Sequence, residues 1–139
     1  MKLMKYIYLV VLISVLFGCG SSGITAKDES KLSVEGTFLV NGKGEKIVLQ
    51  GISFGWHNWW PRFYNASVVK QLKQEWNCTV VRVAMGVEPD GAYLNNPERA
   101  IACVTAVADE AIKNNMYVII DWHSHGIHTE EAKEFFIKM

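Results

Sequence analysis

The chain of 139 residues has no excess of charge, because 14 lysines and arginines balance 14 aspartates and glutamates. It therefore lacks the basic surface that attracts nucleic acids, and we expect no nucleic-acid partner. Cysteine is scarce, with three residues, and none has the spacing of a metal-binding motif. The sequence thus predicts neither a structural zinc site nor a cofactor.

The sequence also lacks a hydrophobic run long enough to span a bilayer comfortably. Residues 6–16 are apolar and follow two lysines, which is typical of a signal peptide. Leu16-Phe17-Gly18-Cys19 resembles a bacterial lipobox, in which cleavage precedes the cysteine and lipid is attached to its sulfur. We predict a signal peptide at 1–19, a flexible tether at 20–31, and an exported protein anchored to the bacterial cell envelope (outer membrane or cell surface) through lipid on Cys19.

Two further cysteines, Cys78 and Cys103, lie among apolar residues. We interpret them as isolated buried thiols, since a free cysteine packs as a small hydrophobic residue. A disulfide between them remains an alternative, because export would permit one.

Short apolar runs alternate with helical patterns through residues 32–139. Such alternation favours a parallel sheet with right-handed crossovers. Ahead of it, two strand-like runs flank Asn41-Gly42, a strong signal for a hairpin turn. We predict an α/β fold in which a β-hairpin precedes three strand–helix units. The hairpin runs are 32–40 and 45–52, the buried strands centre on 51–53, 79–85 and 117–120, and the helices follow 65, 96 and 128.

Polar residues gather where the predicted strands end. Asp121, Trp122 and His123 follow the apolar run 117–120 directly, and the carboxyl ends of parallel strands face the ligand crevice. Arg82 interrupts another apolar run, and an unpaired guanidinium there would be costly. It either holds a carboxylate in an active site or closes a structural ion pair, and His123 either contacts a ligand or is satisfied by the backbone.

Tryptophans are dense in the loop after the first buried strand, at Trp56, Trp59 and Trp60. Indole faces suit the apolar faces of sugar rings, so Trp59 and Trp60 are candidate sugar contacts. The alternative is that these aromatic side chains close the end of the sheet.

A histidine cluster offers a different function. His123, His125 and His128 lie close together in sequence, and three imidazoles could bind zinc in a metallohydrolase. Histidines two apart are common in loops and no further ligand is evident, so we predict no metal.

Several sequence blocks together resemble glycoside hydrolase family 5, the cellulase family, and its bacterial endoglucanases. They keep the family's order and spacing over residues 32–139 and are jointly specific. The blocks are Gly36-Thr37-x-Leu39-Val40-Asn41 with Gly51-Ile52-Ser53, Trp59-Trp60, residues 79–85, Gly91-x-Tyr93-Leu94-x-Asn96-Pro97, residues 117–123, and residues 132–136.

The resemblance implies a TIM barrel of eight strand–helix units and retaining hydrolysis of β-1,4-glucan. It implies that Arg82 supports the nucleophile, that His123 lies in the substrate cleft, and that Trp59 and Trp60 bind glucose units. Relatives often carry a histidine where Gly55 stands and a tyrosine where Gly86 stands. His57 is then a candidate substitute for the first, as a further substrate contact.

The resemblance also implies two catalytic glutamates that this sequence does not contain. The family's acid/base glutamate follows an Asn-Glu-Pro type of motif on the fourth strand, and its nucleophile lies on the seventh. We therefore expect the first three of eight units of a partial TIM barrel, inactive alone, from a secreted endoglucanase. The alternative within this family is a non-catalytic product that binds β-glucan.

Overall fold

The computed structural model describes residues 29–139, which fall into two compact units divided after Ile47. In the first unit, β1 (Ser33–Glu35) and β2 (Phe38–Val40) form an antiparallel hairpin. Glu35 pairs with Phe38, so the connection is a two-residue turn. Gly36 opens this turn with a φ of +63°, a conformation that glycine adopts without steric cost.

This hairpin lies within the first of the two predicted runs, and the predicted turn at Asn41-Gly42 is present but leads to a much shorter antiparallel pairing than expected. Asn41 does begin a turn, in which its side-chain oxygen accepts hydrogen bonds from the backbone N–H groups of Lys43 and Glu45. Only one isolated bridge, between Val40 and Lys46, follows this turn. The N–H groups of Asn41 and Ile47 donate to the carbonyls of Glu45 and Leu39 on either side of this bridge, so the Asn41 side chain shapes the turn and the pairing ends beyond Ile47.

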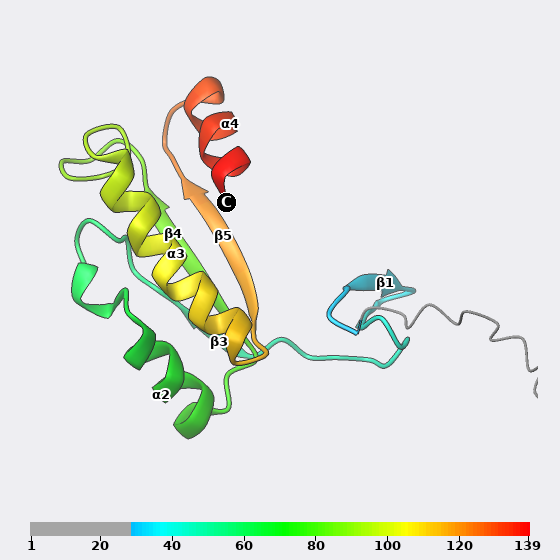
Figure 1. The fold of residues 1–139 in the computed structure, drawn as a ribbon. Coiled ribbons are helices and arrows are strands. Elements are labelled where there is room, and N and C mark those ends of the chain that lie inside the picture. The colour runs from blue at the N-terminus through cyan, green and yellow to red at the C-terminus, as the bar shows by residue number, and fades with distance from the viewer. Residues whose placement is uncertain (1–28) are drawn as a thin grey trace, which may run out of the picture. The chain divides into compact units, whose positions relative to one another are not determined.

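The second unit contains a parallel sheet in which each strand is followed by a helix (Figure 1). β4 lies between β3 and β5, and both of its neighbours run parallel to it. This is the predicted series of three strand–helix units, but the strand at 51–53 was wrongly predicted to be buried, because β3 lies at an edge of the sheet and is exposed at all three residues. The elements are β3 (Gly51–Ser53), η1 (Pro61–Phe63), α2 (Ala66–Trp76), β4 (Val80–Gly86), α3 (Pro97–Lys113), β5 (Tyr117–His123) and α4 (Thr129–Lys138).

Asparagines set the helix boundaries as the sequence predicts. Asn65 caps α2 by accepting a hydrogen bond from the N–H of Val68, and Asn96 caps α3 in the same way. Asn77 ends α2 with a φ of 53°, in the left-handed region that asparagine tolerates. These caps fix where each helix leaves the sheet.

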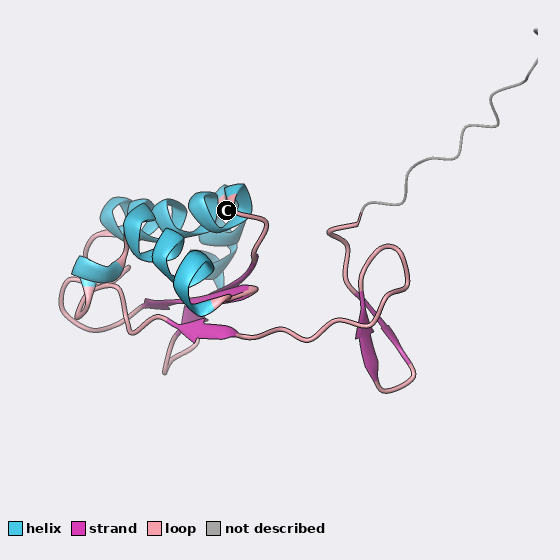
Figure 2. Cartoon of the chain, turned by 90° about the horizontal axis from the view of Figure 1, so that it is seen from below, coloured by secondary structure: helices cyan, strands magenta, loops and turns pink. Residues whose placement is uncertain are grey.

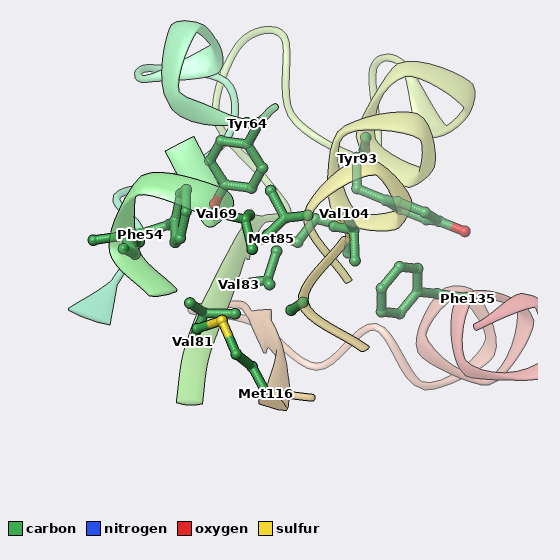
Figure 3. Packing of buried hydrophobic residues seen from close by; sticks show 14 of the residues in the cluster. Phe54, Tyr64, Val69, Val81, Val83, Met85, Tyr93, Val104, Met116 and Phe135 are labelled. Carbon is green, nitrogen blue, oxygen red and sulfur yellow. The ribbon is translucent and has the colours of Figure 1, made fainter. Parts of the chain in front are cut away.

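The three helices of the second unit lie on one face of its sheet (Figure 2). Val81, Val83 and Met85 point to that face and are fully buried, together with Val104 of α3 and Phe135 of α4 (Figure 3). Side chains alternate between the faces of a strand, so the residues between them point the other way. Within residues 48–139 no helix covers that other face, and it carries the polar side chains described below.

Cys78 and Cys103 are free thiols, as interpreted from the sequence, and they do not form the alternative disulfide. Cys78 is buried, Cys103 is half-buried, and both are free. Burial raises the pKa of the Cys103 thiol. These thiols therefore act as small packing groups.

The predicted signal peptide, Cys19 and most of the tether lie outside the described residues. From residue 29 onward, no helix combines the length and apolar character needed to cross a bilayer.

Candidate functional site

The register of the parallel sheet places polar side chains on its uncovered face. Ser53 of β3 pairs with Arg82 of β4, and the next positions along the sheet pair Ala84 with Asp121 and Gly86 with His123. Residues two apart on a strand share a face, so Arg82, Asp121 and His123 project to the same side. Three strands thus contribute to one polar cluster.

One carboxylate oxygen is the centre of this cluster. Oδ2 of Asp121 accepts a hydrogen bond from Nη2 of Arg82 at 2.6 Å and lies 2.8 Å from Nδ1 of His123. Nη1 of Arg82 donates to the Ser53 hydroxyl at 2.7 Å. Nη2 of Arg82 also lies 3.1 Å from Nδ1 of His123. The two residues that the sequence singled out at different strands are therefore neighbours.

These contacts indicate which ring nitrogen of His123 carries the proton. A guanidinium only donates and an ionised carboxylate only accepts, so Nδ1 faces one group of each kind. Its contact with Asp121 is shorter than its contact with Arg82, and we assign the proton to Nδ1. In the neutral ring Nε2 is then an acceptor, and the side chain is 34% exposed. His123 can accept a hydrogen bond from a ligand hydroxyl.

Two tryptophans form an aromatic wall beside the cluster. The rings of Trp56 and Trp59 stack at 4.6 Å with 13° between their planes. Trp56 also lies 4.7 Å from the ring of His123. Trp59 is 60% exposed, so the aromatic wall (Trp56 and Trp59) presents an exposed indole that is linked to His123 through the ring of Trp56.

Trp60 points away from this wall. Together with Phe63 it lines an apolar hollow of about 410 Å³ between β3 and α2. The guanidinium of Arg62 lies 5.2 Å from its ring. The structure therefore separates the two neighbouring tryptophans: Trp59 stacks on Trp56, whose ring contacts His123, whereas Trp60 lines the hollow.

His57, the third predicted substrate contact, lies inside the protein. Its side chain is 1% exposed, and its ring faces the edge of Tyr64 at 6.3 Å. Burial, with a smaller effect from the charge of Arg99, lowers the pKa of His57 to about 4. Neither ring nitrogen has a hydrogen-bond partner among the described residues. In this structure His57 is a neutral packing residue and not a surface contact.

A second carboxylate holds the loop between β5 and α4. Oε1 of Glu88 accepts hydrogen bonds from the backbone N–H groups of His125 and Gly126, both at 2.9 Å. It also accepts from the Ser124 hydroxyl and lies 3.1 Å from Nε2 of His128. Desolvation raises the pKa of Glu88, but the bonds from Gly126 and Ser124 outweigh it and lower that pKa to about 2. Glu88 is therefore ionised, with Oε1 held by this loop, while Oε2 is buried without a hydrogen-bond partner among the described residues.

The histidine cluster lacks the geometry that zinc requires. His123 is bonded to Asp121 and His128 to Glu88, so the two imidazoles serve different carboxylates. Across residues 29–139, no three histidine, cysteine, aspartate or glutamate side chains are arranged to hold a metal ion. The zinc hydrolase alternative finds no support in these contacts.

Sequence reasoning did not single out Asp121, Ser53 or Trp56 as site residues. A signal for Asp121 existed, because it lies two residues before His123 in a strand and so shares its face. The contribution of Ser53 depends on the register between β3 and β4, and that of Trp56 on the path of its loop. Neither can be read from local sequence.

We predict that Glu88→Gln loosens the loop at 124–128. The folded pKa of Glu88, about 2, lies below its ordinary value of 4.5. Its contribution to stability is therefore complete above about pH 4.5 and is lost as the pH falls toward 2. Exchange of the Gly126 amide hydrogen, followed by NMR, is expected to be faster in the variant at neutral pH and less sensitive to acid.

Glu130→Gln is the control, because Glu130 lies at an exposed position of α4 and its side chain is bonded to Lys133. Equal protection in Glu88→Gln and wild type would contradict the prediction.

Comparison with known families gives a match over most of the chain. The profile described as Cellulase (glycosyl hydrolase family 5) matches residues 40–139. Endoglucanase Z of Dickeya dadantii is 41% identical over 125 residues, which cover 87% of this chain and 29% of that protein. Endoglucanase A of Butyrivibrio fibrisolvens is 36% identical over 98 residues, or 68% of this chain and 23% of its own length. The chain thus spans less than a third of these relatives.

Solved structures agree with this match. A structure from Cytophaga hutchinsonii has a TM-score of 0.75 and 44% identity, covering 80% of this chain and 37% of that one. The catalytic domain of an endoglucanase from Thermobifida fusca has a TM-score of 0.68 and 27% identity, covering 79% and 37%. A variant of that endoglucanase was solved in complex with cellotetraose.

The parallel strand–helix units match part of the TIM barrel of these cellulases. The profile match and the identity to the endoglucanases extend over the same units. The chain belongs to glycoside hydrolase family 5, the cellulase family, of whose barrel it forms an amino-terminal part.

Proposed function

We propose that this chain forms part of the sugar cleft of a secreted retaining endo-β-1,4-glucanase. One observation carries the proposal: Arg82 and His123 meet on Asp121 at the carboxyl end of a parallel sheet, and the ring of Trp56 joins His123 to the exposed indole of Trp59. In barrels of this class, that end of the sheet holds the active site. An exposed indole next to a hydrogen-bonding imidazole offers a sugar both a stacking face and a polar contact.

The ligand class follows from the relatives together with this geometry. A related endoglucanase binds cellotetraose, and the Trp59 ring can stack on one glucose unit of such a chain. The Nε2 atom of His123 can accept a hydrogen bond from a glucose hydroxyl. Arg82, fixed by Asp121 and Ser53, supplies positive charge on the face where a nucleophilic carboxylate would be held.

We propose that the described residues bind glucan without cleaving it. Retaining hydrolysis uses two carboxyl groups about 5–5.5 Å apart, one as acid/base and one as nucleophile. Asp121 is bonded to Arg82 and His123, and Glu88 is bonded to the loop at 124–128. Each of these carboxylates has an oxygen committed to a structural contact, and on this proposal both catalytic carboxyl groups are supplied by other parts of a complete barrel.

Cellotetraose titration by calorimetry, with Trp59→Ala as the test variant, examines this function. Loss of a stacking face typically costs about 1 kcal/mol, so we expect roughly fivefold weaker binding. Trp76→Ala, at an exposed position on α2, should bind like the wild type. The same preparation should release no reducing sugar from carboxymethylcellulose. Unchanged affinity in Trp59→Ala, or measurable hydrolysis by the wild-type chain, would contradict the proposal.

We further propose that the protein is exported and anchored to the cell envelope through lipid on Cys19. The charged start, the apolar run and the lipobox-like sequence support it. Cells grown with labelled palmitate should incorporate the label into this protein, and Cys19→Ala should abolish incorporation. A labelled Cys19→Ala protein would rule out this attachment site.

A further inference from the structure

The last residue of β4 is a glycine whose missing side chain leaves room for an aromatic ring. A Cβ atom at Gly86 would lie 3.0 Å from Cε3 of Trp56 and 2.8 Å from Oδ1 of Asn58. Real Cβ atoms essentially never lie as close as 2.8 Å to another atom and seldom as close as 3.0 Å, so a side chain at Gly86 would require the Asn58 amide and the Trp56 ring to shift. The bare backbone at Gly86 is therefore what admits the Trp56 ring.

The loop is fastened in this position by the backbone. The N–H of His57 donates to the carbonyl of Ala84 on β4 at 3.3 Å. The carbonyl of Trp56 in turn accepts from the N–H groups of Trp59 and Trp60, at 3.1 and 2.9 Å. The Asn58 side chain donates to the carbonyl of Asp90 at 3.3 Å. The neighbouring residue His57 therefore anchors Trp56 to β4, and the carbonyl of Trp56 forms the turn that positions Trp59.

The Trp56 ring also connects two groups that a sugar would touch. It stacks on Trp59 at 4.6 Å and packs against His123 at 4.7 Å. A third contact, to the ring of His125 at 5.5 Å, extends the same surface. Trp56 therefore fixes both the stacking face and the imidazole by direct ring contact.

We propose that Trp56 is a positioning residue that holds Trp59 and His123 at a fixed separation for a β-glucan chain, and that Gly86 is required for this role. The proposal rests on the proposed function, because it concerns the same cleft. One glucose unit stacks on Trp59 while a hydroxyl of the bound chain reaches His123. Without Trp56, each contact remains possible alone, but their spacing is no longer set.

Trp56→Ala tests the positioning role directly. We expect cellotetraose affinity, measured by calorimetry, to fall roughly three- to tenfold, as for loss of an aromatic pair. Trp56→Phe should restore most of the affinity, because a smaller ring can occupy the same place. The His123 Cε1–H resonance should also move in Trp56→Ala, because loss of the neighbouring indole removes its ring current, and this shift tests the ring contact. Recovery of affinity in Trp56→Phe tests the positioning role.

Gly86→Val tests whether the glycine admits the ring. Valine favours strand geometry, so β4 itself is not disfavoured. We expect Gly86→Val to weaken cellotetraose binding about as much as Trp56→Ala, and to add little when combined with it. Neighbouring residues that share one space behave in this non-additive way. Full additivity of the two substitutions would overturn the role assigned to Gly86.

Trp59→Ala separates this inference from the proposed function. Weaker binding in Trp59→Ala, with unchanged affinity and an unchanged His123 resonance in Trp56→Ala, would overturn the inference and leave the function standing. No binding of cellotetraose by the wild-type chain would overturn both. Weaker binding in both variants, with rescue by Trp56→Phe, supports both.

Discussion

The arrangement of the site depends on the carboxylate of Asp121. One oxygen of this carboxylate contacts both the guanidinium of Arg82 and the imidazole of His123. Hydrogen bonds to charged groups contribute about 1.5–3 kcal/mol each, and here the pair is partly shielded, with the Arg82 side chain 35% exposed and that of Asp121 25% exposed. Removal of this carboxylate would leave Arg82 with the Ser53 hydroxyl and the Nδ1 atom of His123 as its side-chain partners in the cluster. Asp121 on β5 pairs with the positive charge of Arg82 on β4. The same carboxylate oxygen also fixes the orientation of the His123 ring.

The core on the opposite face holds this contact in place. Val81, Val83 and Met85 alternate with Arg82 along β4. One strand therefore supplies both buried side chains to the core on one face and the arginine of the polar cluster on the other. A slip of one residue in register would exchange the two faces and bury the arginine among the helices. Burial of the three apolar side chains therefore specifies the site as strictly as its own hydrogen bonds do.

The sequence predicted what depends on periodicity and on local caps. The parallel strand–helix order, the caps at Asn65 and Asn96, and the nearness of Arg82 and His123 all follow from patterns within one segment or from the rule that parallel strands end together. The longer hairpin, β1 with β2, turns at Gly36 inside the first predicted run, whereas the predicted turn at Asn41 is followed by a single bridge. The separate directions of Trp59 and Trp60, and the burial of His57, depend on how one loop lies over the glycine at 86, which is a tertiary contact that no local pattern records.

The protonation of His123 tests the central role of Asp121 most directly. Nitrogen-15 NMR of the imidazole, recorded where the ring is neutral, distinguishes a protonated Nδ1 from a protonated Nε2. The structure predicts a single tautomer with the proton on Nδ1, and Asp121→Asn should lose this preference. A proton on Nε2 in the wild-type chain, or an equal mixture of the two forms, would contradict the account.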